Sequence, residues 1–209
     1  NVICIDQRLL NGKNSSVPAT YLNLFDAIRN LFAEHGDRSL FSFHSKGACP
    51  VCRGKGYLGQ YIQYFGETRI LCPECNGQQY MDEVLQIKYR DRNIKQVLDM
   101  PFQEALDFFA DRPFLYERIR LVCDLGLGYM QLGQPLSTVS GGEAQRLKLV
   151  REMSKYRHRK NLLYLFDEPT IGLHSRDVLR VLHVMRQIVE RGNTVVMVEH
   201  DPEMILRSD

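Results

Sequence analysis

The stretch Leu162-Leu-Tyr-Leu-Phe-Asp-Glu-Pro-Thr170 joins five apolar residues directly to two acidic ones. The apolar run has the length of a buried strand, and a second such run at 194–198 follows a helical repeat at 176–190. A buried strand, a helix and another buried strand in this order indicate a parallel sheet with helices, an α/β fold. Ligands of such sheets bind at the carboxyl edge, where Asp167 and Glu168 are expected to lie.

Two adjacent carboxylates at this edge suit phosphoryl transfer. One carboxylate can hold Mg²⁺ through water, and the other can orient the attacking water. Taken alone, a pair of acids after a strand is often only a solvated turn. The two motifs described next favour the functional interpretation.

The segment Ser140-Gly-Gly-Glu143 predicts the start of a helix that runs to about Tyr156, with Ser140 as the N-cap and Glu143 completing a capping box. A well-capped helix would explain these two residues. Gly141 and Gly142, however, cost up to about 1 kcal/mol each relative to alanine in a helix. They favour a site where bare backbone N–H groups approach a phosphate at the positive end of the helix dipole.

The run Thr194–Val198 ends in Glu199, His200 and Asp201. A single histidine after a strand is usually structural or lies on the surface. The acidic pair and the glycine-rich helix start favour the interpretation that His200 is a functional residue at the same edge of the sheet.

A cysteine-rich segment interrupts this pattern. Cys49-x-x-Cys52 and Cys72-x-x-Cys75 are separated by nineteen residues, a spacing typical of tetrahedral zinc sites. Glycines after each pair allow the backbone to turn so that N–H groups point at sulfur. Two disulfides are the alternative, but a chain of intracellular character favours a structural Zn²⁺.

The remaining periodicity predicts a strand at 2–5, a loop at 11–18, and helices at 21–32, 97–110 and 115–125. We therefore expect an α/β core with an inserted zinc module and a helical subdomain, divided as 1–38 (core), 39–95 (zinc module), 96–160 (helical subdomain) and 161–209 (core).

Composition restricts the class of protein. The chain has 209 residues, of which 44% are hydrophobic and 25% charged, with a formal charge of +2. This balance suits a globular protein and does not by itself require a nucleic acid partner. No apolar run approaches the roughly 18 residues of a membrane span, and no signal peptide is recognisable, so a cytoplasmic location is expected. Because the chain opens at Asn1 inside an apolar stretch, we expect a piece of a longer protein.

The order of the motifs resembles a known superfamily. Gln7, SGGE at 140–143, DEP at 167–169 and His200 are similar to the Q-loop, signature, Walker B and H-loop of ATP-binding-cassette (ABC) ATPases. More narrowly, the chain resembles the second nucleotide-binding half of the UvrA family. The stretches that carry this resemblance are IDQ (5–7), PATY (18–21), SGGEAQRLKL (140–149), DEPTIGLH (167–174) and VEHD (198–201).

The resemblance implies ATP and Mg²⁺ as cofactors and assigns residue roles. Glu168 would be the general base, Asp167 would support Mg²⁺, and Gln7 and His200 would contact the ion, the water and the γ-phosphate. The signature residues Ser140, Gly141, Gly142 and Glu143 would face a nucleotide held by an opposing domain. His174 occupies the D-loop, where transporters commonly place aspartate.

One motif of these ATPases is missing. The chain contains no G-x-x-x-x-G-K-[ST] phosphate-binding loop, so the α- and β-phosphates have no cradle. We expect ATP hydrolysis by the intact parent protein and none by this chain alone.

The resemblance also implies partners: damaged double-stranded DNA, a second copy of the parent protein and the excinuclease component UvrB. No membrane partner is implied. Two segments could bind DNA. The aromatic and polar residues between the cysteine pairs resemble a DNA-contacting hairpin, although packing of a small zinc module explains them equally well. The second segment is basic, with a solvated surface as the alternative, and comprises Arg146, Lys148, Arg151, Lys155 and Arg157.

Three competing interpretations remain. The segment 11–18 is less basic than expected for UvrA, so the parent could be a drug-resistance or transporter-associated paralogue. The nucleotide-binding domain of a membrane transporter normally lacks the cysteine insertion. A zinc scaffold like that of DnaJ chaperones shares C-x-x-C-x-G-x-G but would not explain DEPTIGLH.

Overall fold

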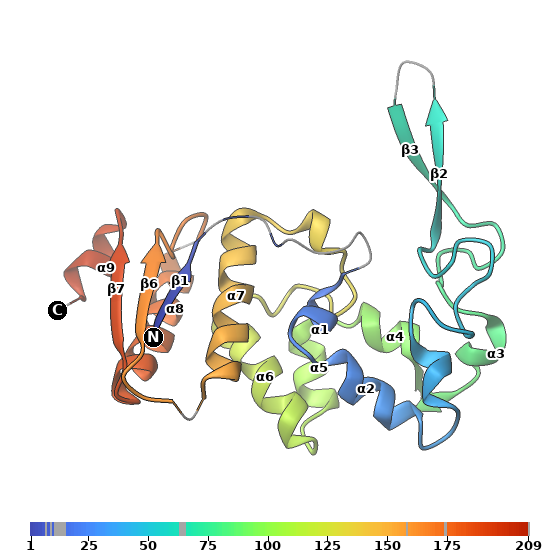
Figure 1. Cartoon of the computed structure of the whole chain (residues 1–209), viewed down its shortest axis with the longest axis horizontal. Coiled ribbons are helices and arrows are strands. Elements are labelled where there is room, and N and C mark those ends of the chain that lie inside the picture. Colours follow the sequence, from blue (N-terminus) through green and yellow to red (C-terminus); the bar gives the residue numbers. More distant parts are fainter. Residues whose placement is uncertain are drawn as a thin grey trace. The chain divides into compact units, whose positions relative to one another are not determined.

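The structure is a computed structural model that describes residues 1–6, 8, 10, 16–62, 66–157, 159–173 and 175–208 (Figure 1). The chain forms two compact units. The first, here called the core unit, comprises Asn1–Leu22 and Met100–Asp209, and the second, the cysteine unit, comprises Asn23–Asp99. The segment 39–95, expected as an insertion, lies within the cysteine unit.

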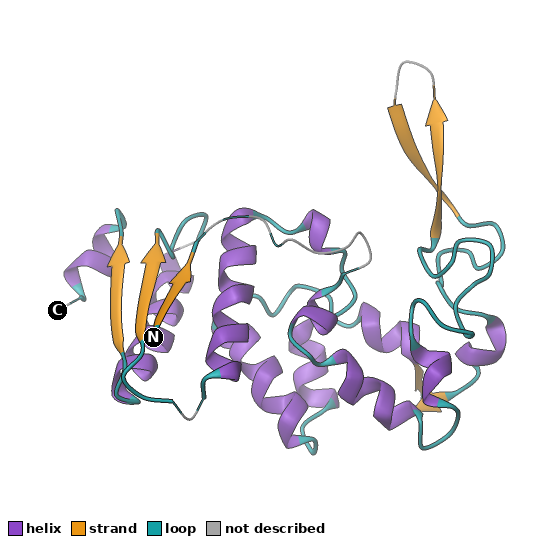
Figure 2. Ribbon diagram, in the orientation of Figure 1, coloured by secondary structure: helices purple, strands orange, loops and turns teal. Residues whose placement is uncertain are grey.

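A three-stranded parallel sheet forms one part of the core unit. Its strands are β1 (Val2–Ile5), β6 (Leu163–Asp167) and β7 (Thr194–Val198), in the order β1-β6-β7 (Figure 2). Phe166 pairs with Ile5 on one side and with Met197 on the other, so the carboxyl ends of all three strands lie at one edge. This arrangement confirms the predicted α/β fold class with a parallel sheet.

The two faces of the sheet differ. Ile3, Ile5, Tyr164 and Phe166 are buried, and helices α7 (Gly141–Lys155) and α8 (Ser175–Glu190) pack against β1 and β7. The opposite face is apolar but open, with Val2, Val196 and Val198 more than half exposed. Helix α9 (Pro202–Leu206) follows β7 and packs against α8.

Helices form the rest of the core unit. Helix α6 (Pro113–Asp124) packs between α5 (Phe102–Phe108) and α7. The unit also contains α1 (Pro18–Tyr21) and the short η2 (Leu136–Thr138). Phe102, Ile119 and Leu147 are fully buried in this helical core. No helix among the described residues is both long enough and apolar enough to cross a bilayer.

Two expected helices are each two helices in the structure. The helix predicted at 97–110 is wrong, because α4 (Ile94–Asp99) ends before Pro101 and α5 begins after it. Proline lacks the N–H of a continuing helix and favours extended backbone at the residue before it. The helix predicted at 21–32 is likewise divided into α1 and α2 (Phe25–Phe32), with Asn23 at a φ of 57° between them. Helix α1 also begins at Pro18, inside the expected loop.

The cysteine unit combines a small aromatic core with a long hairpin. Phe32 lies against Phe41 and Tyr89, and Phe25 stacks on Phe43. The hairpin pairs β2 (Tyr57–Ile62) with β3 (Gly66–Leu71) in antiparallel register. The other elements of the unit are α2, η1 (Arg38–Phe41), α3 (Asp82–Leu85), β4 (Lys88–Tyr89), β5 (Arg92–Asn93) and α4.

Candidate functional site

The ends of β6 and β7 bring two predicted catalytic residues together. The carboxylate Oε1 of Glu168 lies 3.3 Å from Nε2 of His200, and the backbone N–H of Glu168 donates to the carbonyl of Val198. The Glu168 side chain is 34% exposed and that of His200 is 78% exposed, so both are open to a ligand. Glu168 has a φ of 48°, a left-handed conformation that costs a non-glycine residue about 1–3 kcal/mol and is concentrated at functional sites.

Glu199 fixes the loops that carry this pair, although its place in the sequence suggests no role for it. Its Oε1 accepts from the backbone N–H and the hydroxyl of Thr170, and its Oε2 accepts from the N–H groups of His200 and Asp201. Asp201 in turn caps α9 by accepting from the N–H of Met204. The loop after Glu168 and the loop containing His200 are therefore held by one carboxylate.

Of the other residues predicted at this edge, the structure describes one and does not describe two. Asp167 ends β6 opposite Val198, adjacent to Glu168. Gln7 and His174 lie outside the described residues, so their expected contacts with Mg²⁺ and at the D-loop stay predictions.

The predicted start of the signature helix is confirmed. The Ser140 hydroxyl accepts from the N–H of Glu143 at 3.3 Å, and the Glu143 carboxylate accepts from the N–H of Ser140 at 2.7 Å. The hydroxyl of Tyr129 also donates to Glu143. Burial, together with this carboxylate, raises the pKa of Tyr129 to about 12, so the phenol keeps its proton.

Gly142 has a packing role within the chain. A Cβ atom at this position would lie 2.8 Å from the carbonyl oxygen of Ile171, in the loop after the acidic pair. The missing side chain therefore lets the first turn of α7 approach that loop. This contact links the start of α7 to the loop that follows Asp167 and Glu168, whatever the glycine does toward a phosphate.

The predicted basic segment on α7 is largely engaged inside the chain. Arg146 is only 6% exposed, its Nε and Nη1 have no hydrogen-bond partner among the described residues, and burial lowers its pKa. The prediction that Arg146 contacts DNA from the surface of this chain is therefore wrong. Lys148 binds Asp6, while Arg151 lies over the ring of Tyr21.

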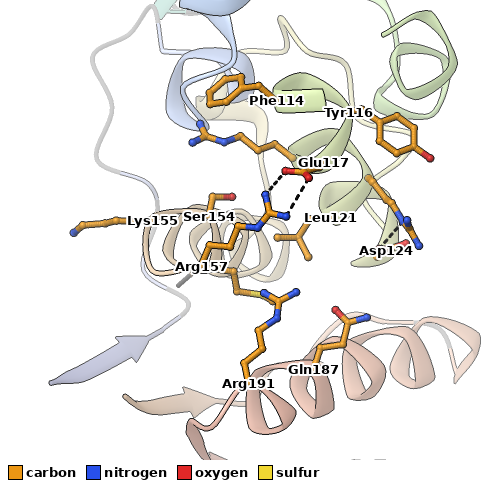
Figure 3. A pocket seen from close by; sticks show the side chains of 13 residues that line it. Phe114, Tyr116, Glu117, Leu121, Asp124, Ser154, Lys155, Arg157, Gln187 and Arg191 are labelled. Carbon is orange, nitrogen blue, oxygen red and sulfur yellow. Dashed lines mark hydrogen bonds and ion pairs between the residues drawn. The ribbon is translucent and has the colours of Figure 1, made fainter. Parts of the chain in front are cut away.

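A hollow of the core unit lies apart from the carboxyl edge of the sheet. A cavity of about 470 Å³ lies between α6, the end of α7 and α8 (Figure 3). The last turn of α7 contributes Ser154 and Lys155, about 20 Å along the helix from Ser140 at 1.5 Å rise per residue. Arg157 extends into it, and its two terminal guanidinium nitrogens bind Glu117 in a half-exposed ion pair.

In the cysteine unit, the four predicted metal ligands form one cluster. The sulfur atoms of Cys49, Cys52, Cys72 and Cys75 all lie within 4.8 Å of one another. Two of the Sγ–Sγ distances are 3.8 Å and 3.6 Å. A tetrahedral zinc ion with Zn–S bonds of about 2.3 Å requires sulfur atoms roughly 3.8 Å apart, so the donors fit zinc. The same separations exclude S–S bonds of about 2.0 Å.

The cluster is built from two similar turns that exchange backbone hydrogen bonds. The N–H of Cys49 donates to Gln79 in the second turn, and the N–H of Cys72 donates to Gly56 in the first. Gly56 and Gln79 both have left-handed φ values, 77° and 70°, four residues after the second cysteine of each pair. The N–H of Gly56 also points at the sulfur of Cys52, at 3.2 Å.

The environment of the thiols differs between neighbours. Backbone N–H groups, first that of Cys75, lower the pKa of Cys72 to about 7. Burial raises the pKa of Cys75 to about 12. A metal ion bound to the cluster would hold all four cysteines as thiolates, because a cation compensates for negative charges packed this closely.

The whole chain aligns with UvrABC system protein A from several organisms. It is 43% identical to UvrABC system protein A of Aquifex aeolicus (strain VF5) and 41% identical to that of Micrococcus luteus, in each case over all of this chain. The crystal structure of UvrA2 from Deinococcus radiodurans superposes on all of it with a TM-score of 0.89 and 38% identity. The chain spans 23%, 22% and 26% of these three proteins. No protein-family model matches.

Proposed function

We propose that this chain, which belongs to the UvrABC system protein A family, supplies the catalytic edge, signature helix and metal module of a longer nucleotide excision repair ATPase. The observation that carries this proposal is the Glu168 carboxylate held 3.3 Å from His200 at the carboxyl edge of a parallel sheet. In the longer protein, Glu168 acts as general base for the attacking water. Asp167 supports Mg²⁺, and His200 contacts the γ-phosphate.

ATP hydrolysis requires parts that this chain does not carry. Positioning and charge stabilisation in phosphoryl transfer come from a phosphate cradle and its lysine as well as from the carboxylates. The chain has no such glycine-rich loop, and the face of its sheet that exposes Val2, Val196 and Val198 is apolar. The 209-residue chain alone is therefore inactive, and residues of the longer protein complete the site.

The signature helix serves a second nucleotide. The N-terminus of α7 places Ser140, Gly141 and Gly142 at the positive end of a helix of 15 residues, suited to a γ-phosphate held by an opposing domain. This arrangement supports a dimer of the longer protein.

The metal module has a structural role. Cys49, Cys52, Cys72 and Cys75 hold one Zn²⁺, which neutralises the thiolates and ties the two turns together. The ion fixes the base of the β2–β3 hairpin, where Arg69 lies over the ring of Tyr57 at 4.6 Å.

DNA is the macromolecular partner. The hairpin exposes Arg69, Ile70 and Leu71 on β3, and the end of α7 adds Lys155 and Arg157 on the core unit. The cationic side chains of Arg69, Lys155 and Arg157 can contact phosphates without reading the sequence of bases. Damaged duplex is the proposed substrate, and the excinuclease component UvrB is the proposed protein partner of the longer protein.

The decisive experiment replaces Glu168 by glutamine in the longer protein. Glutamine keeps the shape of the side chain but cannot accept the proton of the attacking water. Hydrolysis at this site should be lost while ATP binding, measured with a fluorescent analogue, stays within about three-fold of wild type. Glu203→Gln on the exposed face of α9 serves as the matched control. Full hydrolysis in the Glu168 variant would contradict the assignment, as would hydrolysis by the 209-residue chain alone.

A further inference from the structure

Gln145 ties the signature helix to the ends of two strands. It lies in the second turn of α7 and is 2% exposed. Its amide nitrogen Nε2 donates to the carbonyl of Ile5 at 3.2 Å and to the carbonyl of Asp167 at 2.6 Å. Ile5 ends β1 and Asp167 ends β6. One buried amide therefore holds the two strand ends that flank the catalytic edge.

Lys148, three residues later on the same side of α7, holds the chain that follows β1. Its ammonium lies 2.6 Å from the carboxylate of Asp6 and donates to the carbonyls of Asp6 and Arg8, at 3.1 and 2.7 Å. The side chain is only 20% exposed. The hydrogen bond from Lys148 lowers the pKa of Asp6, so the pair stays ionised.

These contacts are more specific than helix packing requires. A buried glutamine costs desolvation that an apolar side chain of the same size would avoid. Its oxygen Oε1 has no hydrogen-bond partner among the described residues, so the contacts of this side chain with the two strand ends are made by the amide nitrogen. Lys148 could extend into solvent from a surface helix, but it instead satisfies three oxygen atoms of one short segment.

We propose that Gln145 and Lys148 are positioning residues for ATP hydrolysis, which fix the ends of β1 and β6 to the signature helix. This inference rests on the proposed function. The carbonyl held by Gln145 belongs to Asp167, and the next residue is Glu168 in its left-handed conformation. A displacement of α7 on engaging a nucleotide is therefore transmitted directly to the backbone that carries the general base.

The test measures steady-state ATP hydrolysis by the longer protein with three substitutions. Gln145→Leu and Lys148→Met remove the polar contacts and keep side-chain volume, while Lys148→Arg keeps the charge. The first two should lower kcat at least about ten-fold with KM within about three-fold, because small misplacements of catalytic groups reduce turnover more than binding. Lys148→Arg should recover kcat to within about three-fold of wild type.

The controls are Gln187→Leu on α8 and Lys160→Met in the loop after α7, which should retain wild-type kcat. Unchanged kcat in Lys148→Met would overturn the proposal, as would equal losses in Lys148→Arg and Lys148→Met. If Gln145→Leu fails to fold, the two Lys148 variants decide, since that side chain reaches solvent.

Hydrogen exchange separates this proposal from the proposed function. In the longer protein, amides of 5–8 and 166–169 should exchange faster in Gln145→Leu and Lys148→Met and at the wild-type rate in Lys148→Arg. If the wild-type protein hydrolyses no ATP, the proposed function fails. In that case, unchanged exchange in these peptides would also contradict the positioning contacts of Gln145 and Lys148, whereas faster exchange would support these contacts.

Discussion

Thr170 and Glu199 are joined at two points, since both the backbone N–H and the hydroxyl of Thr170 donate to the same carboxylate oxygen of Glu199. The second oxygen binds the N–H groups of His200 and Asp201. The loops after β6 and β7 are therefore not independent. A change at Glu199 should alter both the stability of the core unit and the geometry of the Glu168–His200 pair.

Replacing Glu199 by alanine leaves the donors of Thr170, His200 and Asp201 without their acceptor. We expect a loss of about 1–2 kcal/mol in the free energy of unfolding, measured by urea denaturation, because the site is half-buried and water replaces part of the lost bonding. Glu203→Ala on α9 removes only an exposed ion pair with Arg207 and should change stability by less than about 0.5 kcal/mol. Equal effects of the two substitutions would contradict this account.

The same carboxylate predicts a pH dependence. Burial alone would raise the pKa of Glu199, but hydrogen bonds from Asp201, Thr170 and His200 outweigh it and hold the pKa below 4.5 in the folded chain. A lowered folded pKa contributes stability above the unfolded pKa, and this contribution is lost as the pH falls through the folded value. The stability difference between wild type and Glu199→Gln should therefore shrink below about pH 4.5, and a constant difference would contradict it.

Metal removal should affect the cysteine unit selectively. We expect about one zinc per chain by elemental analysis, and loss of the ion in Cys75→Ser. Hydrogen exchange should then accelerate in 45–80 while 163–167 and 194–198 stay protected, because the core unit has its own buried core. Cys4→Ser, which removes an exposed cysteine outside the cluster, should retain the metal. Metal-free protein with unchanged protection in 45–80 would be inconsistent with a structural ion.

Gly54 should tolerate no side chain. Its φ is 75°, and a Cβ atom would lie 2.1 Å from the carbonyl oxygen of Phe43. We expect Gly54→Ala to destabilise the cysteine unit by at least about 2 kcal/mol and to weaken zinc retention in a chelator competition. At Gly36 the nearest atom, at 3.0 Å, belongs to the flexible side chain of Ile87, so Gly36→Ala is the control. Comparable zinc retention in both variants would refute the constraint at Gly54.

Charge reversal at the end of α7 tests the proposed DNA surface. Lys155→Glu combined with Arg157→Glu should weaken binding of the longer protein to damaged and undamaged duplex alike. The slope of log affinity against log salt should fall by roughly one unit for each lost phosphate contact. Arg180→Glu, which breaks an ion pair with Asp177 on α8, is the control for added negative charge. Unchanged affinity and slope in the double variant would leave this end of α7 as solvated surface.

The sequence predicted local motifs better than it predicted where one unit ends and the other begins. Strands β6 and β7 and the Ser140–Glu143 capping box follow from short-range patterns, and the structure confirms them. The two helices that were predicted as continuous, 21–32 and 97–110, cross the boundaries between units after Leu22 and after Asp99. Apolar spacing continues through both boundaries because each half buries its own apolar face, so periodicity alone does not reveal the break.

The sequence alone did not predict the contacts between segments that are distant along the chain. Nothing in the spacing of Gln145 indicates that its amide meets two strand ends more than twenty residues away in either direction. Arg146 has the charge of a surface residue and is buried, a placement set by tertiary packing. For the cysteines, by contrast, the C-x-x-C spacing alone was sufficient, because metal geometry restricts which backbone turns can present four sulfurs.

The hairpin leaves the cysteine cluster at two adjacent points, since Gly56 precedes β2 and Cys72 follows β3, and these two residues share a hydrogen bond. Whatever binds the hairpin and reduces its motion also restrains Cys72, one of the four residues proposed to hold the ion. By thermodynamic reciprocity, if the bound ion strengthens that ligand by some factor, the ligand strengthens retention of the ion by the same factor. If the cluster holds zinc, the equilibrium affinity for the ion is therefore a gauge of occupancy at the hairpin, readable by competition with a chromogenic chelator and without any label on the ligand.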